Sequence, residues 1–249
     1  MVDKKTITEI INKAIIVKCS DGWNLSTKVR STFNQFAKDT RSLTHEELIM
    51  CDKQGNIVFS KKGDNHSVNI SDDEDKELWS NYQDLDVDHN HPTVTGKDVT
   101  TCLSWEDMEN PIKYNLGDKI GEHDYEEVYL VKSVTAEAPN NSRMTLIRNH
   151  QFNITENGES YQKAREELVK VNSQYKNKFT DAVLDYCINH VIEFKEKHPD
   201  AHVRESDFRD EAEDYVIKQL GKFEETNDFK RVQKLFKDAN CNLTVEWTK

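Results

Sequence analysis

Leu85-Asp86-Val87-Asp88-His89-Asn90-His91-Pro92 is the stretch that carries most of the structural and chemical information in this sequence. The segment from Leu85 to Val87 predicts a short buried strand, and two histidines follow it, two residues apart. In an extended or turn conformation, imidazoles at that spacing can reach one divalent ion. An aspartate further along the chain can complete the three protein ligands and open position of a catalytic zinc. The stretch therefore predicts a strand that leads into a metal site.

Ser104-Trp105-Glu106-Asp107 supplies that downstream aspartate. Ser104 is a good N-cap for a helix that begins at Trp105, and Asp107 would lie in the first helical turn, where the helix dipole favours an acid. Capping and catalytic roles for these two residues are compatible. Residues 93–103 form a long, threonine-rich connection before Ser104, so Asp98 is an alternative third ligand.

The segment upstream of the histidines, residues 46–70, predicts a β-meander. Its first apolar run ends at Cys51, and Asp52-Lys53-Gln54-Gly55-Asn56 is a strong turn signal. Residues 57–59 predict a second strand, and residues 67–70 predict a third after another turn.

The flanking regions are predicted to be mainly helical. The pattern Thr6-x-x-Glu9 is typical of a capping box and precedes one apolar helical face. Residues 26–38 predict a second short helix whose inward side chains are Val29, Phe33 and Phe36. Residues 127–131 and 144–147 predict two closing strands joined through Pro139-Asn140-Asn141.

From about residue 158 onward, the sequence predicts helices with three apolar stripes, one of which stops near Gly221. His190 lies on the first of these stripes and is expected to pack in or near the core. The predicted fold class is therefore α/β (α+β), a mixed sheet flanked by helices. Three regions are expected: an N-terminal helical lead-in (1–40), a central domain (41–155) and a helical C-terminal region (156–249).

Composition narrows the class of protein. The 249 residues carry a formal net charge of -12, which argues against a broad nucleic-acid-binding surface. The five cysteines are odd in number and form no CxxC pair, as expected of a reduced cytoplasmic protein. No signal peptide or membrane span is expected. The sequence therefore predicts a cytoplasmic protein, or one found in the host cytoplasm or virion if a phage encodes it.

These motifs together resemble the JAMM (MPN+) zinc metalloprotease family. The resemblance rests on a glutamate at the start of a strand, then His-x-His-Pro, then Ser-x-x-Asp. The His-Asn-His-Pro form is similar to JAMM-like domains of bacteria and phages. The segment from Glu46 to Gly63 also follows the upstream pattern of those domains, and the resemblance covers roughly residues 40–150. The connection between His91 and Ser104 is longer than is usual in the family.

The resemblance implies a zinc (Zn2+) site and a hydrolytic role. His89, His91 and Asp107 would be the zinc ligands, and Ser104 would hold the nucleophilic water or stabilise the oxyanion. Glu46 would be the general base, with Glu47 as the competing choice because the strand register is open. Alternatively, Thr44-x-x-Glu47 is only a capping box. The implied reaction is hydrolysis of a peptide or isopeptide bond in a protein or peptide substrate.

Two other functions remain open from the sequence. The segment 87–91, followed by Thr95-Gly96 and Cys102, is similar to the core of HNH nucleases of the endonuclease VII kind, although the paired CxxC motifs usual there are missing. A non-catalytic JAMM-like scaffold of a phage or mobile element is the other. The helical C-terminal region suggests a protein partner.

Overall fold

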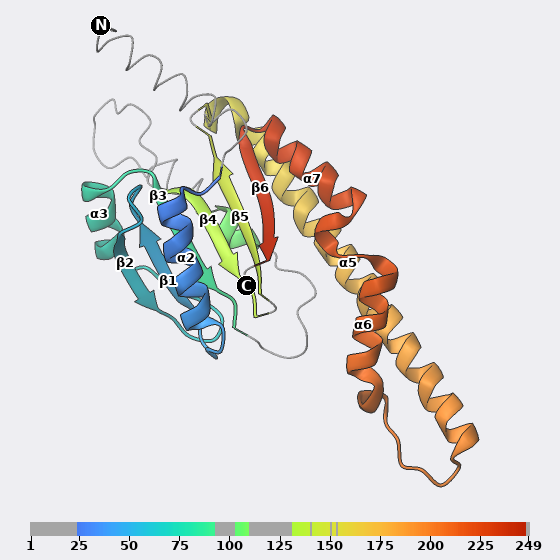
Figure 1. Cartoon of the computed structure of the whole chain (residues 1–249). Coiled ribbons are helices and arrows are strands. Elements are labelled where there is room, and N and C mark those ends of the chain that lie inside the picture. Colours follow the sequence, from blue (N-terminus) through green and yellow to red (C-terminus); the bar gives the residue numbers. More distant parts are fainter. Residues whose placement is uncertain are drawn as a thin grey trace, which may run out of the picture.

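The structure is a computed structural model that describes residues 24–92, 103–109, 131–139, 141–149, 151–152 and 154–247. The described residues form a six-stranded mixed sheet with helices on both faces and a long helical arm on one side (Figure 1). This arrangement confirms the predicted α/β class and the helical C-terminal region. The helix predicted near residues 6–15 and the alternative ligand Asp98 lie outside the described residues.

The strand order in the sheet is β2-β1-β3-β4-β5-β6. β3 and β4 pair in parallel, and each of the other neighbouring pairs is antiparallel. The strands are β1 Glu47–Cys51, β2 Ile57–Lys62, β3 Leu85–Asn90, β4 Val131–Glu137, β5 Ser142–Arg148 and β6 Cys241–Trp247.

The predicted meander is confirmed for its first two strands and wrong for its third. The turn between β1 and β2 forms because the Asp52 carboxylate accepts the backbone N–H groups of Gln54 and Asn56. After β2, the Asp64 carboxylate accepts two further backbone N–H groups, and the Asp64 N–H donates to the carbonyl of Ser67. This compact loop uses the backbone groups that a third strand would need, and residues 67–70 form no strand.

One face of the sheet is covered by α2, Thr27–Thr40. Its Val29, Phe33 and Phe36 are buried as predicted, and they pack against Ile49 and Cys51 of β1. Ser26 caps the helix by accepting the N–H of Val29. On the opposite face, α3 Asp72–Asn81 packs its Leu78 against Met50 and Val87, and it begins with a Ser71–Glu74 capping box.

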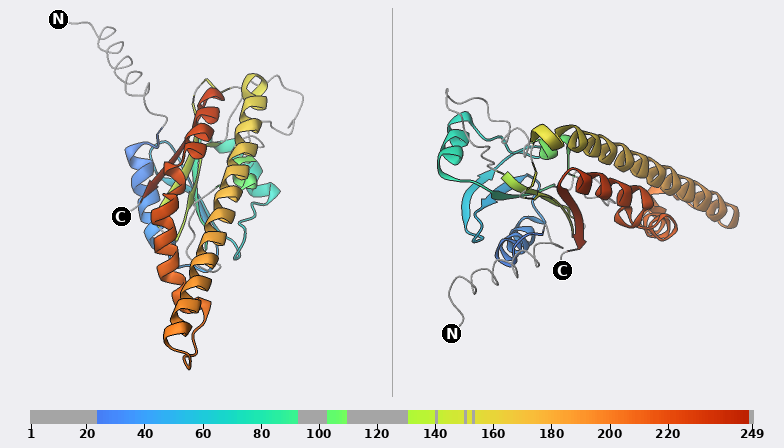
Figure 2. Two further views of the ribbon diagram at one scale, coloured as in Figure 1. Left: turned by 90° about the vertical axis from the view of Figure 1, so that its right-hand side faces the viewer. Right: turned by 90° about the horizontal axis from the view of Figure 1, so that it is seen from above.

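The opposite face is covered by α5, Ile154–Lys197, and α7, Asn227–Asp238, together with the short helix at residues 105–109. Side chains from these helices and from β4, β5 and β6 form the largest hydrophobic core. Between α5 and α7 lie η1 Glu205–Phe208, α6 Arg209–Leu220 and η2 Phe223–Glu225. The distal half of α5 and all of α6 project away from the sheet (Figure 2).

Two strands differ from the sequence predictions. β4 begins at Val131 and continues to Glu137, further than predicted, while residues 127–130 lie outside the described range. β6 was not predicted, yet it pairs antiparallel with β5 along its whole length. The sheet therefore includes strands from both sides of the expected boundary at residue 155. Among the described helices, none is both long and apolar enough to cross a membrane.

Candidate metal centre

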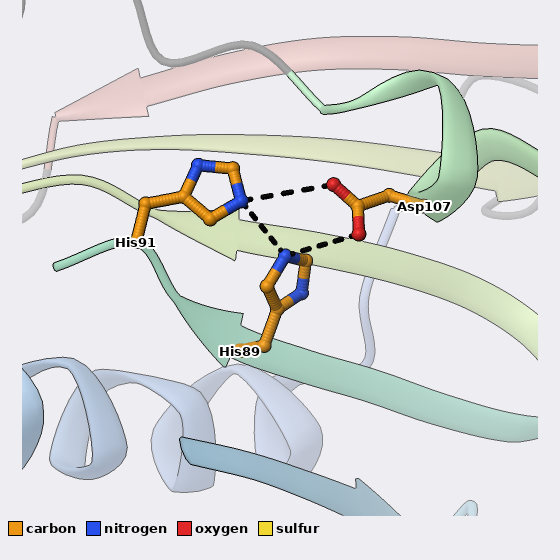
Figure 3. A group of neighbouring side chains, drawn as sticks. All are labelled: His89, His91 and Asp107. Atoms are coloured by element: carbon orange, nitrogen blue, oxygen red, sulfur yellow. Dashed lines mark hydrogen bonds and ion pairs between the residues drawn. The ribbon is translucent and has the colours of Figure 1, made fainter. Parts of the chain in front are cut away.

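β3 places the two histidines on one side of the sheet. His89 lies within the strand, between β1 and β4, and its side chain is buried. The backbone N–H of His91 donates to the carbonyl of Glu137 at 2.8 Å, so the chain stays tied to β4 one residue past the end of β3. Side chains two residues apart in extended backbone point to the same side. The imidazoles of His89 and His91 consequently meet (Figure 3).

The helix at residues 105–109 brings Asp107 to the histidines. Its start is a reciprocal capping arrangement, in which the Ser104 hydroxyl accepts the N–H of Asp107 at 3.0 Å and the Asp107 carboxylate accepts the N–H of Ser104 at 2.7 Å. The predicted capping role of Ser104 is therefore present. This cap does not use the hydroxyl proton of Ser104, and it fixes the orientation of the Asp107 carboxylate.

Two residues of α5 hold this short helix in place. The hydroxyl of Tyr161 donates to the carbonyl of Met108 at 2.8 Å, inside the hydrophobic core. The guanidinium of Arg165 donates to the carbonyl of Trp105 at 2.9 Å and lies 3.8 Å from the centroid of its ring. The position of Asp107 thus depends on α5.

The three side chains are close enough to bind one ion. The Nε2 atoms of His89 and His91 are 3.0 Å apart. The carboxylate oxygens of Asp107 lie 3.3 Å from the Nε2 of His89 and 3.7 Å from the Nε2 of His91. Zinc bonds of about 2.1 Å in a tetrahedral set imply ligand atoms about 3.4 Å apart. The observed separations bracket that distance, so the donor set fits zinc without a large rearrangement.

Each side chain of the cluster changes the pKa of a neighbour. Burial opposes ionisation of Asp107, but His89 and His91 outweigh it and hold the Asp107 pKa well below its usual value. Burial likewise opposes protonation of His89, yet the carboxylate of Asp107 outweighs it, and the net effect raises the His89 pKa. The Asp107 carboxylate therefore stays ionised near neutral pH. Its negative charge would offset the positive charge of a metal ion bound between the two imidazoles.

The strand register places Glu46, rather than Glu47, on the side of the histidines. Leu48 of β1 lies directly opposite His89, and residues opposite each other in an antiparallel pair share a face of the sheet. Glu46, two residues before Leu48, therefore lies on this face as well, while Glu47 points to the other face. The N–H of Glu47 donates to the side chain of Asn90, and its carboxylate contacts His45 at 2.9 Å.

The ionisation of Glu46 is also coupled to the cluster. Its side chain is half-buried, and this burial raises its pKa. The charges of His89 and His91 lower the pKa, and that of Asp107 raises it. Glu46 thus lies within electrostatic range of all three candidate ligands.

Sequence reasoning missed a polar network on the opposite face of β3. Asp88 is fully buried there, and its pKa is raised well above its usual value, first by burial and then by Glu137. Glu137 forms a buried ion pair with Arg143, whose guanidinium also donates to Asn34 of α2 at 2.9 Å. Asp88 therefore points away from the histidines and cannot orient their rings.

The cluster of His89, His91 and Asp107 is the one group of three or more such side chains with metal-binding geometry in the described part of the chain. A comparison with protein-family models, with curated proteins and with solved structures gives no match.

Proposed function

We propose that this protein is a zinc-dependent hydrolase that cleaves a peptide or isopeptide bond. One observation carries the proposal: two imidazole nitrogens and a carboxylate converge on one point, with a half-buried glutamate on the same face of the sheet. The order of these residues also follows the JAMM-like pattern of Glu, His-x-His-Pro and Ser-x-x-Asp.

The donor set supports zinc as the ion. Two neutral histidines and one carboxylate are typical ligands of catalytic zinc, and three protein ligands leave a coordination position open. When bound, zinc polarises a substrate carbonyl and lowers the pKa of a coordinated water to about 7.

The protein's own residues supply the remaining steps. Glu46 accepts the proton of the attacking water and then delivers it to the leaving nitrogen. Because burial raises the pKa of Glu46, its carboxylate is a stronger base towards the attacking water than an exposed glutamate would be. Ser104, at the N-terminus of the helix that carries Asp107, donates a hydrogen bond from its hydroxyl group to the developing oxyanion.

The proposed substrate is a protein or peptide, and the proposed compartment is the cytoplasm. Cys51, Cys187 and Cys241 are buried free thiols in the described residues, as expected of a protein that works under reducing conditions. Burial raises the pKa of the Cys51 thiol to about 12, so it is not a competing nucleophile.

The test combines elemental analysis with activity. Purified protein should contain about one zinc per chain, and the His89→Ala/His91→Ala variant should contain none. Both proteins are then assayed with a panel of peptide and isopeptide substrates. Zinc that stays stoichiometric in the double variant would refute the assignment of the ligands.

A matched pair of variants tests the base. Glu46→Gln should retain zinc and lose turnover, whereas Glu47→Gln should retain both, because Glu47 faces away from the histidines. The reverse result would refute the register argument. Zinc binding with nuclease rather than peptidase activity would favour the HNH-like alternative, and absence of zinc from the wild-type protein would favour a scaffold.

A further inference from the structure

The helical arm, residues 176–220, leaves one side of α5 uncovered. At the base of the arm, the hydroxyl of Tyr175 donates to the carbonyl of Gly221 at 2.7 Å. Beyond this point α5 packs against η1 and α6 on one side (Figure 2). Large apolar side chains nevertheless remain exposed on α5: Leu184 is 49% exposed, Ile188 38% and Ile192 52%.

These three side chains form a single stripe that faces away from α6. They are spaced four residues apart, which keeps them on one side of a helix with 3.6 residues per turn. The buried side chains Val183 and Cys187 lie on the opposite side of α5 and join the core that includes Ala212 and Val216 of α6. The stripe is therefore not part of the contact between the two helices.

Opposite charges flank the stripe symmetrically. Asp181 lies seven residues before Ile188, and Lys195 lies seven residues after it. Seven residues are close to two helical turns, so both charged side chains lie in line with the apolar stripe. Both are exposed. Along the helix, this surface is therefore acidic at Asp181, apolar around Ile188 and basic at Lys195.

This pattern is complementary to itself when reversed. If a second α5 lies antiparallel across the first, with a twofold axis at Ile188, then Leu184 meets Ile192 of the second copy. In the same register, Asp181 of each copy meets Lys195 of the other. A twofold interface needs this kind of self-complementarity, in which the same patch serves both subunits.

We propose that the exposed stripe of α5 is a homodimer interface and that its occupant is the same stripe of a second copy, antiparallel, with Ile188 against Ile188. The contact from Asp181 to Lys195 spans about 21 Å of helix at 1.5 Å per residue. An interface of that length is smaller than a standard-size protein interface, so the dimer should be weak and concentration-dependent.

Charge reversal tests the register directly. Sedimentation equilibrium of the full chain should show a reversible monomer–dimer equilibrium. Asp181→Lys places like charges opposite Lys195 at two symmetric sites and should weaken dimerisation about tenfold, as should Lys195→Asp. The double variant Asp181→Lys/Lys195→Asp restores opposite charges and should dimerise as the wild type does.

A matched control keeps the change in net charge constant. Glu193→Lys alters the same helix by the same charge as Asp181→Lys but lies about 140° away from Ile188 around the helix, and it should leave dimerisation unchanged. A wild-type chain that stays monomeric at all concentrations would overturn the proposal. A dimer that is equally stable in both single reversals would overturn this interface.

A cross-link tests the position of the axis. Ile188→Cys should form a disulfide between two copies under mild oxidation, since the two residues face each other. The wild type measures the background from native cysteines, and Glu193→Cys serves as the control on the same helix. Equal cross-linking at positions 188 and 193 would contradict the antiparallel register.

Discussion

Zinc affinity should depend on two residues of α5 that touch neither the ion nor its ligands. Tyr161 and Arg165 hold the helix at residues 105–109 through its backbone carbonyls, and this helix carries Asp107. We predict that Tyr161→Phe and Arg165→Met both weaken zinc binding, because either change loosens the short helix while leaving His89 in place.

The expected magnitudes follow from the contacts that are lost. Tyr161→Phe removes one hydrogen bond of about 1 kcal/mol and keeps the ring, so affinity should fall about fivefold. Arg165→Met removes a hydrogen bond from a charged donor and the contact with the Trp105 ring, together about 2–3 kcal/mol. Its affinity should fall about 30- to 150-fold, at or slightly above the range typical of residues that support metal ligands.

Competition with a chromophoric chelator measures the affinity, and urea unfolding of each metal-free variant measures its stability. Arg165→Lys keeps a charged donor and should recover part of the loss. Arg231→Met is a matched control, because the ion pairs of Arg231 with Glu167 and Asp228 lie at the surface. Wild-type affinity in folded Tyr161→Phe and Arg165→Met proteins would refute the claim that α5 positions Asp107.

Three further predictions concern protons, the buried network and a turn. Zinc affinity should rise with pH up to the His89 pKa and then level off, because zinc must displace the His89 proton at lower pH and Asp107 raises that pKa above 6.5. Chelator titrations across pH measure this profile, and a flat profile below pH 6.5 would contradict the prediction. Arg143→Met should destabilise the fold by about 3–5 kcal/mol in urea unfolding, because it leaves the buried Glu137 without its ion-pair partner. The double variant Arg143→Met/Glu137→Gln should recover much of this loss, and equal stability of the single and double variants would argue against the pairing. Gly55→Ala should cost more than about 1 kcal/mol by the same assay, since φ is +79° and a Cβ atom would lie 2.8 Å from the backbone of α2; a neutral change would show that the turn rearranges easily.

The candidate ligands could be predicted because two of the three lie in one short motif. A His-x-His pair in an extended segment needs only local geometry to converge, and β3 supplies it. Asp107 was assigned as the third ligand through the resemblance to the Ser-x-x-Asp pattern, and the Ser104 cap that orients it is also local. The choice between Glu46 and Glu47 could not be made from the sequence, because it depends on how β1 pairs with β3.

Contacts between distant residues account for what the sequence did not predict. β6 is an exception, because Cys241 to Trp247 alternate strictly between apolar and polar residues, the pattern of a half-buried strand. That local signal was missed, and only the pairing of β6 with β5 depends on distant contacts. The third meander strand had apolar residues at alternate positions, but the side-chain bonds of Asp64 favoured a loop. The buried network around Arg143 joins Asn34, Glu137 and Arg143, which are far apart in the chain.

The return of the chain as β6 makes the C-terminal helices part of the sheet's architecture. α5 to α7 form an insertion between two adjacent strands, and Arg148 of β5 lies opposite Cys241 of β6. Glu246 near the end of β6 also forms an ion pair with Arg30 of α2, on the other face of the sheet. A chain cut at residue 155 would expose the edge of β5 and would also lose Tyr161 and Arg165. If those two residues position Asp107 as predicted, the candidate ligand set also requires the C-terminal region. A shift of α5 relative to β3 should then change the distance between the carboxylate and the histidines.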